Sequence, residues 1–100
     1  MSEQPIEVRH NAAAHRFEAT VEGKLGVAEY ELVDNVMRIN HTEVPATATQ
    51  RGIAGQIVGA ALAYADAHGL KVEPRCGYVR NYMRRHPATQ HLLPDGFPLG

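Results

Sequence analysis

The sequence predicts an α+β domain with a mostly antiparallel sheet of about five strands, one long central helix and a short C-terminal helix. Residues 6–44 alternate apolar and polar side chains with the period of two typical of strands, whereas residues 50–68 carry apolar side chains at helical spacing. A length of 100 residues suits one hydrophobic core. We therefore expect a single domain over residues 1–100, with its core over about residues 5–87.

The first half of the chain predicts four strands, over residues 6–10, 15–21, 25–33 and 36–44. The turns between them are short. Glu22-Gly23-Lys24 contains a glycine that can adopt a positive φ, and both residues of Asp34-Asn35 tolerate the left-handed region. Strands joined by such short turns form an antiparallel meander.

The pattern changes at Pro45, because proline cannot continue a central ladder. Residues 45–49 are expected to form a loop and residues 50–68 a helix that ends before Gly69, a typical position for a C′ glycine. A short strand over residues 70–74 should lie parallel to the strand over residues 36–44, because strand–helix–strand units usually form right-handed crossovers. The remaining residues predict a short helix over 78–86, stopped by Pro87, and a surface tail over 88–100.

The composition argues against several classes of function. Ten Lys and Arg against eleven Asp and Glu give a formal charge of -1, and no basic run is long enough to follow a phosphate backbone, so no nucleic-acid partner is expected. Cys76 is the single cysteine and cannot form an internal disulfide, and no apolar stretch has the length of a signal peptide or a membrane span. We expect a cytoplasmic protein without membrane partners. The six histidines show no familiar zinc spacing, so no metal is expected.

The segment from Val44 to Gln56 is the most informative part of the chain, because a strand ends, a loop of small residues follows, and a helix opens on Gly52 and Gly55. A helix N-terminus presents unpaired N–H groups and the positive end of the dipole, and glycines let a phosphate approach the backbone. The segment lacks the Walker loop and the three-glycine dinucleotide fingerprint, which disfavours ATP and NAD. A purely structural alternative is that these glycines ease helix entry and close packing on the sheet.

The residues Thr49-Gln50-Arg51-Gly52-Ile53-Ala54 resemble the pyrophosphate-binding loop of the GNAT N-acetyltransferase superfamily, where a Gln/Arg-x-x-Gly-x-Gly/Ala signature follows a strand and opens a helix. Thr49 stands where that signature has Gln or Arg. Three further blocks, at residues 41–45, 72–79 and 82–87, resemble the small YjdJ-type branch of the superfamily in the same order. The resemblance covers roughly residues 36–87 and implies a minimal GNAT-like fold.

The resemblance implies acetyl-CoA as the cosubstrate and an unidentified amine, small or on a protein, as the acceptor. Acetyl-CoA would lie where the strands over residues 37–44 and 70–74 splay apart, with its pyrophosphate on the backbone amides of residues 51–56. Arg51 could add a charge-assisted contact to a phosphate. The cofactor-binding residues expected on this basis are Val44, Arg51, Gly52, Ile53, Ala54, Gly55, Gln56 and Cys76.

Acyl transfer needs a neutral amine, a stabilised oxyanion and a proton for the departing thiolate. His41 and Glu43 are two residues apart in a predicted strand, so they should share one side of the cleft, where either could deprotonate an ammonium. Cys76 lies beside Arg75 at the start of the last helix, a position that favours the thiolate. It could act as an acetyl-accepting nucleophile, contact CoA or fill space as a small apolar side chain.

Tyr82 is the candidate general acid, because larger GNAT enzymes often place a tyrosine about two turns into this helix to donate to the CoA sulfur. Tyr82 falls one residue short of that position, and Tyr78 is a weaker rival. Both could instead be packing residues with a wet hydroxyl. Two alternatives to an enzyme remain open: a non-catalytic CoA-binding or acyl-CoA-binding module, and an interaction protein in which the glycine loop is only a helix entry.

Overall fold

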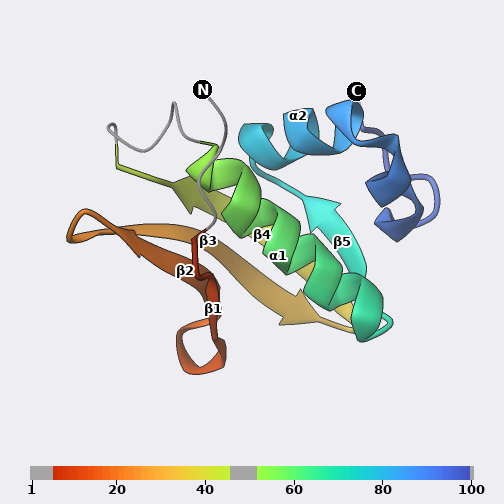
Figure 1. Cartoon of the computed structure of the whole chain (residues 1–100). Helices are drawn as coiled ribbons and strands as arrows, with labels where there is room; N and C mark the ends of the chain where they lie inside the picture. The colour runs from red at the N-terminus through yellow and green to blue at the C-terminus, as the bar shows by residue number, and fades with distance from the viewer. Residues whose placement is uncertain (1–5, 46–51, 100) are drawn as a thin grey trace.

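A computed structural model describes residues 6–45 and 52–99 of the chain. Five strands form one sheet in the order β1-β2-β3-β4-β5, and a long helix lies across it (Figure 1). The strands are β1 (Arg9–Asn11), β2 (Arg16–Val21), β3 (Lys24–Val33), β4 (Val36–Glu43) and β5 (Lys71–Pro74). The helices are α1 (Ile53–Ala67) and α2 (Gly77–Arg85), with short 3₁₀ turns at Ala12–Ala14 and Pro87–Leu92. No helix of the described residues is long and apolar enough to cross a membrane.

Two tight turns connect the antiparallel strands as predicted. Glu22 and Gly23 have φ values of 53° and 77°, and Asp34 and Asn35 have φ values of 51° and 64°. Two successive residues at positive φ form the turn whose twist matches that of the flanking strands. β2, β3 and β4 consequently pair as an antiparallel meander, and β5 pairs with β4 in the parallel sense, which confirms the predicted crossover through α1.

The first strand is shorter than predicted. β1 covers Arg9–Asn11, and the 3₁₀ turn that follows ends at His15 in the left-handed region, with φ 55°. Residues 6–8 lie outside the ladder, and the backbone N–H of Ile6 donates to Gln56 Oε1 of α1 at 3.1 Å. The beginning of the described chain is therefore attached to the helix as well as to the sheet.

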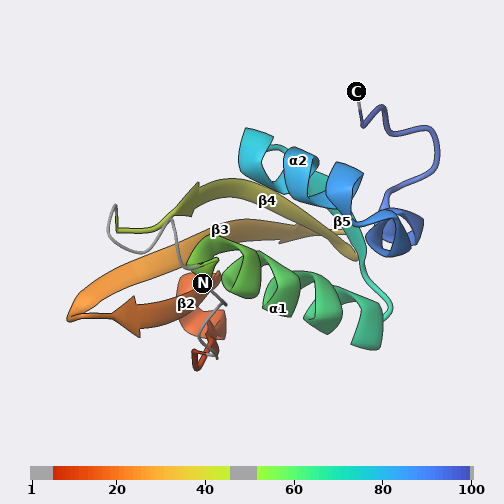
Figure 2. The same cartoon turned by 45° about the horizontal axis from the view of Figure 1, so that its top comes forward.

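α1 buries its apolar face against one face of the sheet (Figures 1 and 2). Ile57 and Val58 are fully buried, as is Met37 of β4. Gly26 of β3 allows this close approach, because a Cβ there would lie 3.1 Å from both Ile57 Cδ1 and Val44 Cγ1. The N-terminal half of α1 is thus held directly beside the end of β4.

The C-terminal end of α1 has the glycine cap that the sequence predicts. Gly69 adopts φ 69°, its N–H donates to the carbonyl of Asp66 at 3.4 Å, and the Leu70 N–H donates to the carbonyl of Ala65 at 2.8 Å. These two bonds satisfy carbonyl groups that the helix leaves unpaired. After this reversal of direction at Gly69, the chain continues directly into β5.

Residues 88–99, the last that the structure describes, differ from the expected surface tail. Pro87–Leu92 forms a 3₁₀ turn, and Leu92 is only 4% exposed within the hydrophobic core. A turn this short has no helical period to detect in the sequence. The core therefore extends beyond residue 87, the boundary that the sequence analysis sets.

Substituting Leu92 with alanine should lower the free energy of unfolding by about 2–5 kcal/mol, because the change removes a buried side chain and leaves a cavity. Leu32→Ala is the matched control, since Leu32 is 53% exposed and should cost within about 0.5 kcal/mol. Urea denaturation measures both variants. Equal effects of the two substitutions would show that the C-terminal turn does not contribute to the core.

Candidate functional site

β4 continues beyond the point at which β5 leaves it. The parallel register runs from Val36 opposite Lys71 to Ile39 opposite Pro74, and a last bond joins the Arg75 N–H to the Ile39 carbonyl at 3.0 Å. β4 extends on to Glu43 while the chain after β5 turns into α2. The two strands therefore separate along the C-terminal half of β4, as the sequence analysis expects.

A β-bulge lies in β4 at the start of this separation. Ile39 pairs with Tyr30 and His41 pairs with Glu29, so Asn40 is an extra residue that has no paired residue on β3. A bulge reverses the alternation of side chains along the strand. Ile39 points toward α1 before the bulge, and Thr42 and Val44 do so after it.

A small cavity of about 140 Å³ forms where the end of β4 meets the start of α1. Thr42 and Val44 line it from the strand side, and Tyr78 of α2 lines it as well. Gly52 and Ala54 complete the wall from the N-terminus of α1. The fold thus brings together three of the predicted cofactor-binding positions, Val44, Gly52 and Ala54.

The N-terminus of α1 begins at Gly52, which adopts φ 70° and ψ 20° as the N-cap residue. The N–H groups of Ile53, Ala54 and Gly55 fall in the first turn, where a helix has no backbone acceptor for them. Ile53 as a whole residue is 1% exposed, and its side chain belongs to the hydrophobic core. Arg51 lies outside the described residues.

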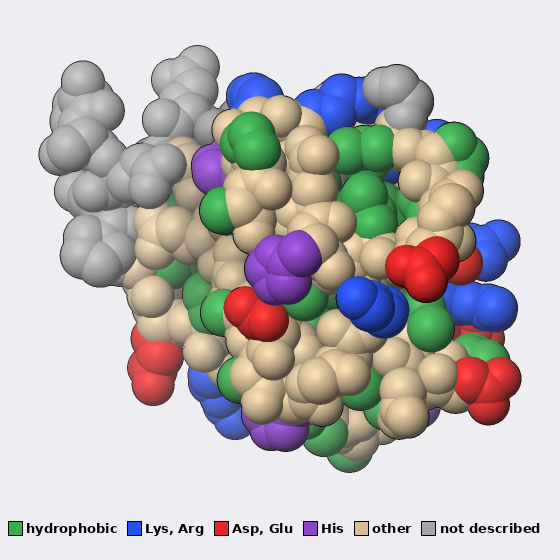
Figure 3. Space-filling model, turned by 90° about the vertical axis from the view of Figure 1, so that its right-hand side faces the viewer, with side chains coloured by type: hydrophobic (Ala, Val, Ile, Leu, Met, Phe, Trp, Pro, Cys, Tyr) green, Lys and Arg blue, Asp and Glu red, His purple; other side chains and the backbone are tan. Residues whose placement is uncertain are grey.

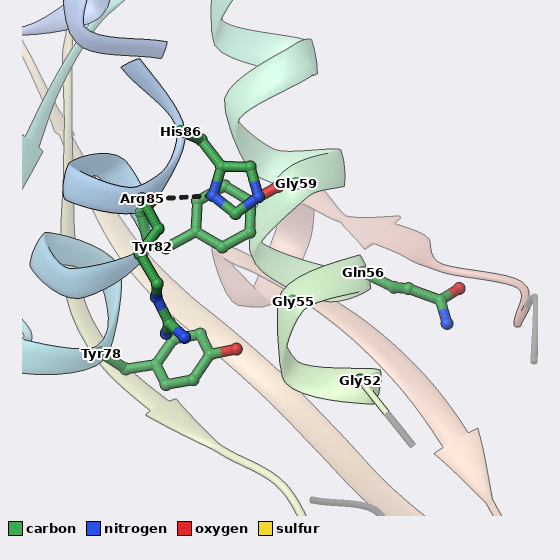
Figure 4. Close-up of a pocket in the computed structure, with 8 residues that line it drawn as sticks. All are labelled: Gly52, Gly55, Gln56, Gly59, Tyr78, Tyr82, Arg85 and His86. Atoms are coloured by element: carbon green, nitrogen blue, oxygen red, sulfur yellow. Dashed lines mark hydrogen bonds between the residues drawn. The ribbon is translucent and has the colours of Figure 1, made fainter. Parts of the chain in front are cut away.

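Gln56 of α1 is hydrogen-bonded through both its backbone and its side chain. Its backbone N–H donates to the Gly52 carbonyl at 3.1 Å, so that amide is already used within the helix. Its side-chain Oε1 accepts from the Ile6 N–H, and Figure 4 shows the side chain directed away from the tyrosines of α2. Gln56 also lines the larger cavity described below, and its part in cofactor binding stays a prediction.

Cys76 lies between the end of β5 and α2 as the N-cap residue of that helix, and its thiol donates to Thr42 Oγ1 with Sγ and Oγ1 3.6 Å apart. Burial raises the pKa of the thiol. Hydrogen bonds from the Thr42 side chain and from backbone groups of Val79, Tyr78 and Thr42 favour the thiolate and outweigh burial, so the pKa lies below its ordinary value. The side chain that accepts from the thiol can rotate to donate to the thiolate.

This lowered pKa predicts that Cys76 reacts with iodoacetamide at a lower pH than an unperturbed thiol, because the thiolate is the nucleophile. Thr42→Val removes a hydrogen bond to the thiolate, so the midpoint of the alkylation profile should move to higher pH. The exposed Thr20 of β2 supplies the control, Thr20→Val, which should leave the midpoint in place. An unchanged midpoint in Thr42→Val would contradict the assigned contact.

His41 and Glu43 lie side by side, as their spacing predicts, with His41 Nε2 and Glu43 Oε1 3.1 Å apart. Both side chains are largely exposed, 54% and 73%. Because Thr42 faces the α1 side and successive residues of a strand alternate, the pair points to the opposite face of the sheet. The pair thus stands at the strand separation, on the other side from the small cavity.

A second, larger cavity of about 580 Å³ lies between α1 and α2 (Figure 4). Its described lining residues are Gly52, Gly55, Gln56, Gly59, Tyr78, Tyr82, Arg85 and His86. Tyr82 Oη lies beside Gly59, where a Cβ would be only 2.9 Å away, and the Tyr82 ring stacks on that of His86. Tyr78 lines both cavities, so of the two tyrosines it is the one that reaches the end of β4.

Several residues that the fold brings to this region carry no functional signal in the sequence. Thr42 carries no motif, and its contact with Cys76 spans 34 positions in the chain. Arg85 and His86 reach the larger cavity because α2 packs against the glycines of α1, a contact that no spacing within α2 reveals. The described residues contain no group of three or more His, Cys, Asp or Glu able to hold a metal ion. On the surface seen in Figure 3, side chains of both charges are interspersed.

The sequence model of the GCN5-related N-acetyltransferase family matches residues 16–92. The chain belongs to the GCN5-related N-acetyltransferase family. This match confirms the superfamily that the four sequence blocks resemble. It begins at the first residue of β2 and ends at Leu92, so the family unit includes the C-terminal turn that the sequence analysis takes for a tail.

Similar proteins agree with this assignment to the GCN5-related family. Proteins named Protein NATD1 from Gallus gallus, Mus musculus and Homo sapiens are each 33% identical over 91 residues, which is 88% of this chain and 83%, 83% and 80% of theirs. The solution structure of a GCN5-like protein from Staphylococcus aureus matches with a TM-score of 0.72 at 20% identity, covering 89% of this chain and 88% of that chain. The structural likeness confirms the predicted fold: a small α+β domain with a mostly antiparallel sheet.

Proposed function

We propose that this protein binds acetyl-CoA and transfers its acetyl group to an amine, either small or on a protein. The observation that carries the proposal is the separation of β4 from β5 directly beside the uncapped N-terminus of α1. Membership in the acetyltransferase family agrees with it. The cytoplasmic location and the YjdJ-type branch stay predictions from the sequence.

The proposed path of the cofactor follows the free groups of the backbone. The edge of β4 over residues 40–43 no longer pairs with β5, so its backbone groups, apart from the Thr42 group that bonds the Cys76 thiol, would pair with the amides of pantetheine. The N–H groups of Ile53, Ala54 and Gly55 would receive the pyrophosphate at the positive end of the α1 dipole. Arg51 remains a predicted phosphate contact.

The chemistry then needs groups on both faces of the sheet. His41 or Glu43 would take a proton from the ammonium, so that the neutral nitrogen attacks the acetyl carbon and the C–S bond breaks. The departing thiolate of CoA needs a proton, and Tyr78, which reaches the end of β4, is better placed to donate it than Tyr82. Cys76 touches Thr42 beside this point and stays a candidate for direct acetyl transfer or for a CoA contact.

Calorimetry with acetyl-CoA and CoA on the wild type and on Cys76→Ala tests cofactor binding apart from the role of the thiol. The proposal expects saturable binding by both proteins, and release of free thiol from acetyl-CoA when an accepting amine is present. Binding without thiol release across a broad panel of amines and peptides would favour the non-catalytic CoA-binding module. No binding of either compound at millimolar concentration would refute both readings.

A further inference from the structure

The first described residues of the chain, residues 6–11, are attached to α1 at two points. At the first point, the Ile6 N–H donates to Gln56 Oε1 at 3.1 Å. At the second point, the His10 ring meets the Tyr64 ring edge-on, with 4.4 Å between the centroids. Gln56 and Tyr64 lie about 12 Å apart along the helix axis, a distance that an extended chain covers between Ile6 and His10. Residues 6–11 thus form a strap along α1, which we call the N-terminal strap.

His10 is the centre of the second attachment. Its ring stacks on that of Phe17, with 4.2 Å between the centroids and 4° between the planes. Its Nε2 and Tyr30 Oη lie 2.6 Å apart in a hydrogen bond. Phe17 belongs to β2, Tyr30 to β3 and Tyr64 to α1, so one half-buried imidazole joins the strap to three elements of the fold.

No acidic side chain compensates a positive charge on His10. Among the described residues His10 forms no ion pair. The charged side chains nearest to it in the paired strands are Arg9, Arg16 and Glu18, and the alternation of a strand places them on the opposite face of the sheet. A proton on His10 would therefore be enclosed by rings and no counter-charge.

The titratable groups that face His10 are two phenols and two other histidines. Tyr30 of β3 stays neutral, because burial raises its pKa, and Tyr64 of α1 is the second phenol. His15 packs against Tyr30 with 5.8 Å between the centroids, and His68 stacks on Tyr64 at 3.9 Å. Burial and, second, repulsion by a charged His68 hold the pKa of His10 below its ordinary value.

We propose that the N-terminal strap is a pH-sensitive device, which detaches from α1 and β2 when His10 is protonated. At neutral pH the uncharged imidazole completes the ring cluster and attaches the strap. The imidazolium is better solvated in the detached strap, so acidification favours detachment. Detachment also breaks the bond between Ile6 and Gln56, and thereby frees the side chain of a residue that lines the α1–α2 cavity.

The direction of the pH dependence follows from the form that binds the proton more tightly. In the detached strap His10 has the ordinary histidine pKa of 6.5, and in the attached strap its pKa is lower. The contribution of His10 to attachment is therefore fully present above about pH 6.5. It is lost as the pH falls from there through the lowered pKa of the attached form.

Backbone order parameters from NMR relaxation test the proposal on the whole chain at about pH 7.5 and about pH 5. The amides of the N-terminal strap should change from about 0.85, typical of ordered backbone, to below about 0.6, while those of the β3–β4 ladder stay near 0.85. The change should follow the titration of the His10 ring, which its Hε1 chemical shift reports. A strap that stays ordered at the lower pH, or that loses order together with the β3–β4 ladder, would overturn the proposal.

Three variants assign the effect to His10. His10→Phe keeps a ring against Phe17 and Tyr64 but binds no proton, so its strap should stay ordered at both pH values. His68→Gln removes the repulsion, so its strap should lose less order at the lower pH than that of the wild type. His41→Gln is the matched control, because this histidine is exposed on the opposite face of the sheet and its loss should leave the response unchanged. Loss of order at the lower pH in His10→Phe equal to that of the wild type would exclude His10 as the sensor.

Discussion

Replacing Gly52 with glutamate is expected to weaken acetyl-CoA binding roughly 30- to 700-fold. Gly52 lines both cavities and is the N-cap of α1, so a carboxylate there would stand within a few ångströms of the bound pyrophosphate. Two unit charges 4–8 Å apart repel by roughly 2–4 kcal/mol at an effective dielectric constant of about 20. The carboxylate would also compete for the N–H groups of the first turn.

Gly52→Asn separates the charge from the backbone effect. Gly52 has φ 70°, where any other residue is strained by about 1–2 kcal/mol, although asparagine tolerates this region better than most. Both variants should therefore melt at lower temperature than the wild type, while only the glutamate should lose most of its affinity in calorimetry. Equal affinities of the two folded variants would contradict a phosphate site at this helix start and favour the reading of the glycine as a simple helix entry.

Local rules account for what the sequence predicts correctly about the fold. Asp34-Asn35 and Gly69 adopt positive φ for reasons contained in two or three neighbouring residues. The alternation in the first half and the helical period of α1 likewise depend only on neighbours in the chain. Such signals fix the type and order of the elements, so the sheet with its parallel last strand could be predicted before the structure.

The parts of the candidate site that could not be predicted depend on contacts between residues far apart in the chain. The bulge at Asn40 has no glycine or proline to mark it, yet it decides that Thr42 and Val44 face α1 while His41 faces the other way. The position of Arg85 in the larger cavity depends on the packing of α2 against the glycines of α1, which no spacing within α2 reveals. The residues of the site could be proposed from sequence blocks, but their division between the two faces of the sheet could not.

That division leads to a definite expectation for His41 and Glu43. The pair lies on the face opposite α1, so we expect the amine to approach the strand separation from that face while the cofactor enters from the helix side. His41→Gln should lower kcat by about 10²–10⁴, the usual contribution of a general base, with little change in the affinity for acetyl-CoA. The measurement is the initial rate of thiol release at saturating acetyl-CoA, set beside a calorimetric titration of the same variant.

Glu43→Gln should lower kcat less, because Glu43 Oε1 orients His41 Nε2 at 3.1 Å and does not itself need to take the proton. Since the two side chains act as one unit, the double variant should be hardly slower than His41→Gln alone. Glu31→Gln, at an exposed position of β3, removes an equal charge and should leave kcat unchanged. A kcat within threefold of the wild type in His41→Gln would show that the pair takes no part in the chemistry. If the losses of activation free energy in the two single variants add up in the double variant, the His41 imidazole and the Glu43 carboxylate act separately on the amine.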